Sequence, residues 1–330
     1  METLLYPRPD VDRLIEDLHG ALQPSRAPVQ LTLYGEPAAP QPLFRVRGRT
    51  LKGRPLTPDR VRVVEPTAWD GPVYAVDAGA KVLLDLGAYK IVEAKVAAAE
   101  WHGRTRTRTI GPVKRVRMFA DLSEAAGWLA SIEAEAAARY ARHSPGALIL
   151  LDRPLIAGAG AAGRAYRLLL SRAWRVVGVA KTSRIRLTTG EGLIGYLQAL
   201  GEERAPGLPW VYYPLFHGLR RHSWALGGIA VARLGPGGPA FRVDIHWRLI
   251  DRVGVLETVG LLAGLQDPSA PGYPYPLKAV HQMSRISREE LELDRMLLME
   301  RLEAAGLGGA VRSAAAAVAY KKRYIWGEGV

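Results

Sequence analysis

The amino-acid sequence predicts an α/β protein in which helices flank a mixed β-sheet, with an elaboration at each end of the chain. Strand-like apolar runs alternate with helical patterns through the middle of the chain, and two of those runs end in an aspartate. The chain has 330 residues and is 48% hydrophobic, so it can bury a substantial core. We expect an N-terminal elaboration (1–70), a core (71–205) and a C-terminal part (206–330) that completes the same domain.

The first elements are an elaboration followed by three strands. Residues 10–22 have the apolar spacing of an amphipathic helix, and the proline-rich stretch after them includes a strand-like piece at 29–34. Strands are then expected at 72–77, 89–98 and 108–119, with the basic segment Trp101–Arg108 as the turn between the last two. Together they predict an antiparallel meander.

The core continues with helices and strands in alternation. Ser123 can cap a helix that runs to about Arg142. A strand at 147–152, a helix at 161–173, a buried strand at 175–181 and a helix at 190–201 follow. The order β-β-β-α-β-α-β-α is typical of the ribonuclease H-like arrangement.

The C-terminal part begins with a hairpin and ends with helices. Strands at 223–233 and 240–249 are joined by a Gly- and Pro-rich turn. Helices are expected at 253–265, 276–284, 288–305 and 308–320. Ser287 and Glu290 have the spacing of a capping box at the start of the third of these helices.

Composition favours a polyanionic partner, with DNA first. The formal charge is +13, from 45 Lys+Arg against 32 Asp+Glu, and basic clusters such as that at Arg104 and Arg106 lie on or beside predicted strands. A generally basic surface is the alternative reading. The absence of cysteine excludes disulfides, Cys-ligated metal and thiol catalysis. The sequence has neither a membrane-length apolar run nor a signal-peptide pattern, so we expect a cytoplasmic protein and no membrane partner.

Asp77 and Asp152 are the best indication of function, because each ends an apolar strand-like run. A carboxylate at the edge of a buried strand is costly to desolvate unless it is paired or binds a cation. Two neighbouring strands of this kind predict a shared divalent-metal site, although each aspartate can instead cap a turn. Two ions held by carboxylates can position and activate a phosphodiester for hydrolysis.

Other polar residues are weaker candidates. A third acid should come from the helix before Asp152, as Glu133 or Glu135, and we favour Glu135. Lys181 ends an apolar strand and can contact phosphate or carboxylate, or extend to solvent. His281 can bind metal, move a proton or pack in the interior. The GxGxxG pattern at 158–163 is separated from its strand by six residues, which argues against dinucleotide binding.

Four segments, AVDAG (75–79), LLDRPL (150–155), VGVAKTS (177–183) and GYPYPLKAVHQMSRIS (272–287), resemble the NurA family of DNA nucleases. The resemblance spans roughly residues 70–290. It implies a ribonuclease H-like core, Mn²⁺ or Mg²⁺ as cofactor, a dimer, and DNA end resection with the hexameric translocase HerA. We therefore expect a DNA exonuclease, acting 5′ to 3′ by two-metal catalysis.

The resemblance also assigns roles to residues. It implies that Asp77, Asp152 and the helix glutamate, Glu135 by its spacing, bind metal, that His281 completes the site, and that Tyr273 or Lys181 places the DNA. Arg153 departs from the family pattern, which has glycine after this aspartate; the arginine can contact phosphate or compete with a metal. The alternative hypothesis is therefore a catalytically silent DNA-binding or translocase-docking subunit. A ribonuclease or transposase-like enzyme on the same core is a further alternative.

Overall fold

The computed structural model describes residue 13 and residues 39–324, so the helix predicted at 10–22 and the strand predicted at 29–34 lie outside the described residues. The chain divides into two compact units. The first contains Arg153–Leu155, Gly178–Pro274 and the described residues up to Ala68, and the second contains Trp69–Asp152, Ile156–Val177 and the residues from Tyr275 onward. The predicted three-part division stays a prediction.

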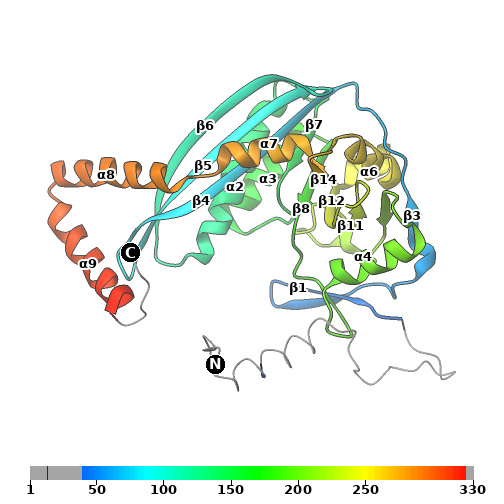
Figure 1. The fold of residues 1–330 in the computed structure, drawn as a ribbon, viewed down its shortest axis with the longest axis horizontal. Helices are drawn as coiled ribbons and strands as arrows, with labels where there is room; N and C mark the ends of the chain where they lie inside the picture. The colour runs from blue at the N-terminus through cyan, green and yellow to red at the C-terminus, as the bar shows by residue number, and fades with distance from the viewer. Residues whose placement is uncertain (1–12, 14–38, 325–330) are drawn as a thin grey trace, which may run out of the picture. The chain divides into compact units, whose positions relative to one another are not determined.

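The second unit is built on a mixed sheet (Figure 1). Its long strands β4 (Pro72–Asp85), β5 (Lys90–His102) and β6 (Thr105–Phe119) form an antiparallel meander, as the sequence predicts. The short strand β7 (Leu148–Leu151) pairs in parallel with the other side of β4. Next to β7 comes β8 (Val176–Ala180), whose first two residues belong to this unit. The predicted α/β class with a mixed sheet flanked by helices is confirmed.

Helices cover both faces of this sheet because side chains alternate along β4. Ala78 packs with Ile132 of α2 (Ser123–Ala141), and α3 (Gly160–Arg172) packs on α2. Gly79 points the opposite way, toward Ser284 at the end of α7 (Tyr275–Ser284), so α7 lies on the other face (Figure 1). The helices α8 (Arg288–Ala304) and α9 (Gly308–Tyr324) follow.

Two local predictions in this unit need correction. The β5–β6 turn is only Gly103–Arg104, so Arg106 and Arg108 belong to β6 and not to a long basic turn. Ser123 does not cap α2; instead the Asp121 carboxylate accepts a hydrogen bond from the Ser123 backbone N–H at 2.8 Å. The capping box of Ser287 and Glu290 at the start of α8 is confirmed.

The first unit contains an antiparallel sheet of its own strands. Its order is β3 (Val61–Val63), β10 (Trp210–Tyr212), β11 (Gly227–Arg233) and β12 (Ala240–His246), and the predicted β11–β12 hairpin is confirmed. The other strands and α-helices of this unit are β1 (Pro42–Val46), β2 (Arg49–Lys52), β9 (Arg186–Leu187), α4 (Leu193–Arg204), α5 (Trp247–Arg252), α6 (Val255–Gly264), β13 (Gln266–Asp267) and β14 (Ala270–Pro274). The strand predicted at 240–249 ends early because α5 begins at Trp247. Within the described part of the chain, no helix has the length and apolar character required to cross a bilayer.

Candidate metal centre

Two carboxylates meet where β4 and β7 run in parallel. Val76 pairs with Leu151, and both are fully buried, so the next residues, Asp77 and Asp152, lie abreast at the sheet. Each aspartate side chain is only 8% exposed. The apolar sequence on either side forces these strands into the core, and the two acids are thereby held close together in a poorly solvated position.

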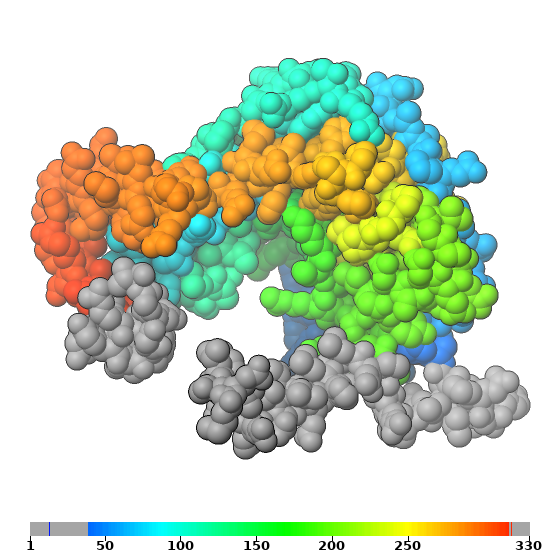
Figure 2. All heavy atoms as spheres, viewed as in Figure 1, coloured from blue at the N-terminus to red at the C-terminus, as the bar shows by residue number. Residues whose placement is uncertain are grey.

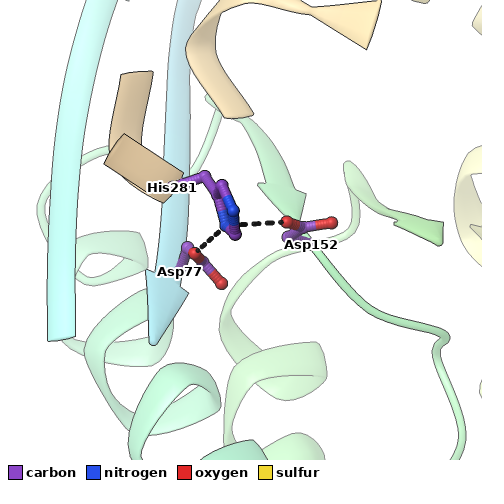
Figure 3. Close-up of side chains that lie close together, drawn as sticks. All are labelled: Asp77, Asp152 and His281. Carbon is purple, nitrogen blue, oxygen red and sulfur yellow. Dashed lines mark hydrogen bonds and ion pairs between the residues drawn. The ribbon is translucent and has the colours of Figure 1, made fainter. Parts of the chain in front are cut away.

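An imidazole from α7 completes the group (Figure 3). The Nδ1 atom of His281 lies 2.9 Å from Oδ2 of Asp77 and 3.5 Å from Oδ2 of Asp152. One potential ligand atom from each of the three residues lies within 4.8 Å of the others. The His281 side chain is 53% exposed, so its imidazole is accessible to solvent while the two carboxylates are buried.

The donor set suits a hard divalent cation. Carboxylate oxygens favour Mg²⁺ and Mn²⁺, and an imidazole nitrogen adds a ligand that transition metals accept readily. Because both carboxylates are largely removed from water, a cation bound between them compensates for their desolvation. The residues present therefore fit Mn²⁺ or Mg²⁺.

Ser284, which is not among the residues predicted from the sequence, is also part of the centre. Its hydroxyl donates to Oδ2 of Asp77 at 2.6 Å, and the residue is 1% exposed. Ser284 lies three positions after His281, which places both side chains on one face of α7. That spacing is the signal that could have identified it.

The contact of α7 with β4 is close. A Cβ atom at Gly79 would lie 2.5 Å from the Ser284 carbonyl oxygen, a distance that real side chains do not adopt. Glycine at this position is therefore required for the helix that carries His281 to approach the strand that carries Asp77.

The two candidate glutamates of α2 lie in different surroundings. Glu133 is fully buried, and its Oε1 accepts a hydrogen bond at 3.0 Å from the backbone N–H of Ala78, the residue after Asp77. Glu135 instead lines a cavity between α2 and the β5–β6 strands. Among the described residues, the group with metal-ligand spacing contains neither glutamate.

Two of the predicted DNA-contacting arginines lie beside α7: Arg104 in the β5–β6 turn and Arg106 at the start of β6. The guanidinium of Arg104 lies 5.9 Å from the ring centre of Tyr275, and Nη1 of Arg106 lies 4.0 Å from the sulfur of Met283. The Tyr275 hydroxyl donates to the Gly103 carbonyl. These contacts hold a basic turn against the helix that carries His281.

Lys181, Tyr273 and Arg153 belong to the first unit. The Nζ atom of Lys181 lies 4.8 Å from the ring centre of Tyr273, a cation–π contact. In the same unit Asp244 is buried, pairs with Arg242 at 2.7 Å, and accepts a hydrogen bond from the Leu155 backbone N–H at 2.9 Å. Asp244 is therefore a structural residue of this unit.

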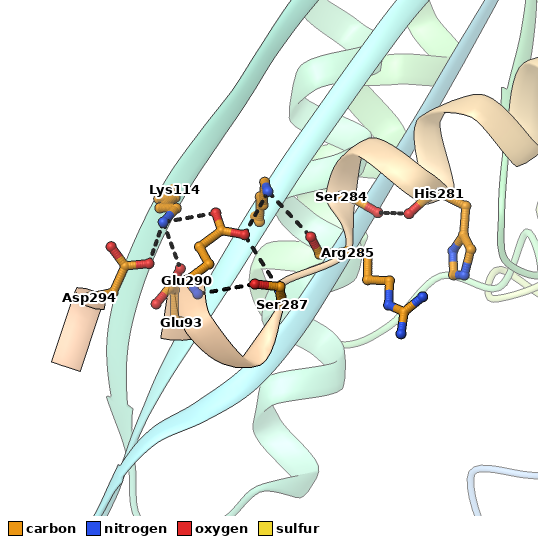
Figure 4. Close-up of polar contacts among 9 residues, drawn as sticks. Glu93, Lys114, His281, Ser284, Arg285, Ser287, Glu290 and Asp294 are labelled. Atoms are coloured by element: carbon orange, nitrogen blue, oxygen red, sulfur yellow. Dashed lines mark hydrogen bonds and ion pairs between the residues drawn. The ribbon is translucent and has the colours of Figure 1, made fainter. Parts of the chain in front are cut away.

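Charged residues also hold α8 against the sheet, and we call them the α8 ion-pair cluster: Lys95, Lys114, Glu93, Glu290 and Asp294. Figure 4 labels all of them except Lys95. Glu290 lies 2.9 Å from both lysines, and these contacts lower its pKa to about 2. Glu93 is 1% exposed, and burial together with the nearby Asp294 raises its pKa to about 7. Lys114 also contacts Asp294. The start of α8, which follows α7 after three residues, is thereby fixed to β5 and β6.

Both the sequence and the fold of this chain have known relatives. The NurA domain family model matches residues 106–286, whereas no curated protein matches the chain. The structure is similar to the NurA nuclease from Sulfolobus solfataricus, with 18% identity, a TM-score of 0.54, and coverage of 74% of this chain and 87% of that one. A second NurA crystal structure matches with 11% identity and a TM-score of 0.49, covering 73% of this chain and 90% of that one. The family model covers more than half of the 330 residues, and the chain belongs to the NurA family of DNA nucleases.

Proposed function

We propose that the protein hydrolyses DNA phosphodiester bonds with Mn²⁺ or Mg²⁺ held by Asp77, Asp152 and His281. The convergence of these three side chains from β4, the end of β7 and α7 is the observation that supports the proposal. Divalent ions held by carboxylates supply Lewis acidity at the phosphate and a means of activating water. Ser284 orients the Asp77 carboxylate through its hydrogen bond.

Glu133 is our choice for the third acid of a two-ion site. Its carboxylate bonds to the backbone next to Asp77, whereas Glu135, which the sequence spacing favours, lines a cavity beside β5 and β6. A two-ion mechanism requires more oxygen ligands than two aspartates provide, and a buried glutamate adjoining Asp77 can supply them.

The protein is proposed to bind DNA through contacts to the phosphate backbone of the DNA, without base specificity. Arg104 and Arg106 lie beside α7 in the second unit, and Arg153, Lys181 and Tyr273 are the proposed contacts from the first. Arginine suits the planar phosphate geometry, and an aromatic ring can stack on an exposed base. The net charge of +13 favours DNA association at low salt.

The finer biological role is inferred from the family. We propose a 5′ to 3′ exonuclease that resects DNA ends in the cytoplasm together with a HerA-type hexameric ATPase. Linear duplexes labelled at either the 5′ or the 3′ end test polarity, since 5′ resection releases the 5′ label first. Early release of the 3′ label instead contradicts the proposed direction. Co-purification with and without a HerA-type ATPase tests the partner.

A homodimer is part of the same proposal. In Figures 1 and 2, α8 and α9 extend beyond α2 and α3 at one end of the second unit. Leu293, Met296 and Leu297 of α8 share a helix face and are 56%, 70% and 51% exposed. Exposed apolar faces of this kind mark protein interfaces, so a second copy is the proposed occupant. Light scattering of wild type and Met296→Glu tests this, with a dimer expected only for the wild type.

The central experiment compares wild type with Asp77→Ala in digestion of linear DNA with Mn²⁺, with Mg²⁺ and with EDTA. We expect digestion by wild type that depends on the metal, and a loss of roughly 100- to 1000-fold in the variant. The exposed Asp251→Ala of the first unit is the matched acidic control. Equal digestion by wild type and Asp77→Ala would remove Asp77 from the catalytic site.

The second candidate is a silent DNA-binding or translocase-docking subunit, which is motivated by Arg153 directly after Asp152. The same assay separates the two functions. Salt-sensitive DNA binding without cleavage in either metal supports the silent subunit, whereas cleavage eliminates it.

A further inference from the structure

A cavity of about 270 Å³ lies in the second unit between α2 and the strands β5 and β6. Apolar side chains of the sheet and the helix form its floor, among them Val96, Ile110 and Ile132. The rings of Tyr74 and Tyr140, stacked at 3.6 Å between centres, also line it. The Tyr140 hydroxyl is already engaged, because it donates to Oε2 of Glu100 at 2.5 Å. The cavity therefore offers a mainly apolar surface to a ligand.

The cavity is separate from the metal centre because the sheet lies between them. Asp77 points to the α7 face, where it contacts His281 and Ser284. Ala78 points to the α2 face, where it packs with Ile132, a residue of the cavity wall. A ligand in the cavity therefore occupies a second site, and its binding does not depend on the nuclease reaction.

Three arginines surround the opening: Arg108 and Arg115 from β6 and Arg139 from α2. None of their side chains forms a hydrogen bond or ion pair with any residue that the structure describes. Glu135 is the one carboxylate among the lining residues of this cavity, so the formal charge around it is positive. Unpaired guanidinium groups in this arrangement favour an anion, and their planar geometry matches phosphate.

We propose that this cavity binds a nucleoside phosphate, with the base on the apolar floor and the phosphate between Arg108, Arg115 and Arg139. An apolar floor with a charged opening matches a ligand that has a flat, weakly polar part and a compact anionic part. At about 270 Å³ the cavity is slightly smaller than typical ligand sites, which are roughly 300–1000 Å³, so it accommodates at most one nucleotide and excludes a duplex. The nucleotide can be a free 5′-mononucleotide or the terminal nucleotide of a single DNA strand.

The test measures binding by the full chain in EDTA, so that no DNA is cut. Calorimetry compares AMP, inorganic phosphate and a 5′-phosphorylated single-stranded oligonucleotide. Two variants remove the site in different ways: Arg139→Ala removes a charge, and Ala136→Phe fills the cavity that Ala136 lines. Arg142→Ala is the matched control, because this arginine is exposed, follows directly after α2 and is not a lining residue.

We expect AMP to bind more tightly than phosphate, and both cavity variants to weaken AMP about 10- to 100-fold while Arg142→Ala changes it less than about twofold. If only the oligonucleotide shows this pattern, the site takes the end of a strand. The proposal is overturned if neither AMP nor the oligonucleotide binds more tightly than phosphate, or if Arg142→Ala weakens binding as much as Arg139→Ala. Thermal melting shows whether Ala136→Phe folds normally. If it does not, the result for Arg139→Ala, which changes an exposed residue, decides the test.

Discussion

The Nδ1 atom of His281 lies 2.9 Å from Oδ2 of Asp77, although 204 positions separate the two residues in the sequence. Asp77 is fixed by a buried strand, whereas His281 depends on the position of α7 against that strand. Anything that shifts α7 therefore changes the distance between imidazole and carboxylate. Substitutions of the residues that hold α7 against β4, or that contact Asp77, should therefore test the proposed metal site most directly.

The first prediction distinguishes the two glutamates of α2. Glu133→Gln should reduce Mn²⁺-dependent DNA digestion about 100-fold or more, because the fully buried Glu133 adjoins Asp77. Glu135→Gln should cause a much smaller loss, since Glu135 lines the separate cavity. Initial rates over a series of Mn²⁺ concentrations measure both effects. The reverse order of the two variants would identify Glu135 as the ligand.

Ser284→Ala should weaken Mn²⁺ binding and DNA digestion about 10- to 100-fold, as expected when a group that orients a metal ligand is removed. The physical reason is the 2.6 Å hydrogen bond from the Ser284 hydroxyl to Asp77. Calorimetric titration with Mn²⁺ measures the affinity, and Ser171→Ala on the exposed surface of α3 is the control. Unchanged metal affinity in Ser284→Ala would contradict this role.

Arg104 in the β5–β6 turn and Arg106 at the start of β6 should contribute to DNA affinity by neutralising phosphates. The double variant Arg104→Ala/Arg106→Ala should bind linear DNA more weakly at all sequences, and its slope of log K against log salt should fall by about 0.9 for every phosphate that is no longer neutralised. Fluorescence anisotropy in EDTA at several salt concentrations measures this. Arg301→Ala, an exposed arginine of α8, provides the comparison. An unchanged slope in the double variant argues against phosphate binding at this turn.

Glu93 should make stability fall as pH rises. Its pKa is raised from 4.5 to about 7 in the folded protein, so its contribution is fully present below pH 4.5 and is lost as pH rises through 7. Glu93→Gln should flatten this dependence and raise the free energy of unfolding at pH 8 by about 1–3 kcal/mol, because a buried charge is removed. Urea denaturation between pH 5 and 8 measures it, with Glu300→Gln as control. A variant less stable than wild type at pH 8 would mean that the contact with Lys114 outweighs the cost of burial.

Local sequence patterns correctly predict most helices and strands of the second unit. Where they fail, the pairing of strands that are distant in the sequence determines the structure. The runs that end at Asp77 and Asp152 are apolar enough to be recognised as buried strands. The segment around Arg106 is polar on both faces, so its sequence predicts a turn. It belongs instead to β6, which is the edge of the sheet and exposed along most of its length.

The site is harder to predict where the helices are rich in alanine. In α2 the buried residues include Ala134, Ala137 and Ala138, so the apolar stripe is too weak to show whether Glu133 or Glu135 faces the interior. The role of His281 rests on the resemblance to a family, because nothing in its neighbourhood indicates a partner 204 positions away. Ser284 has the same long-range partner, and its spacing of three residues from His281 indicates it only once His281 is placed at the site.

The closeness of Gly79 to the Ser284 carbonyl has a consequence for engineering this enzyme. The backbone of Gly79 lies against the backbone of Ser284, so changes to neighbouring side chains cannot adjust the distance between the His281 imidazole and the Asp77 carboxylate in small steps. A single methyl group added at Gly79 would push α7 away from β4, and His281 away from Asp77. Under the proposed function, Gly79→Ala should therefore lower DNA cleavage without altering any charged group.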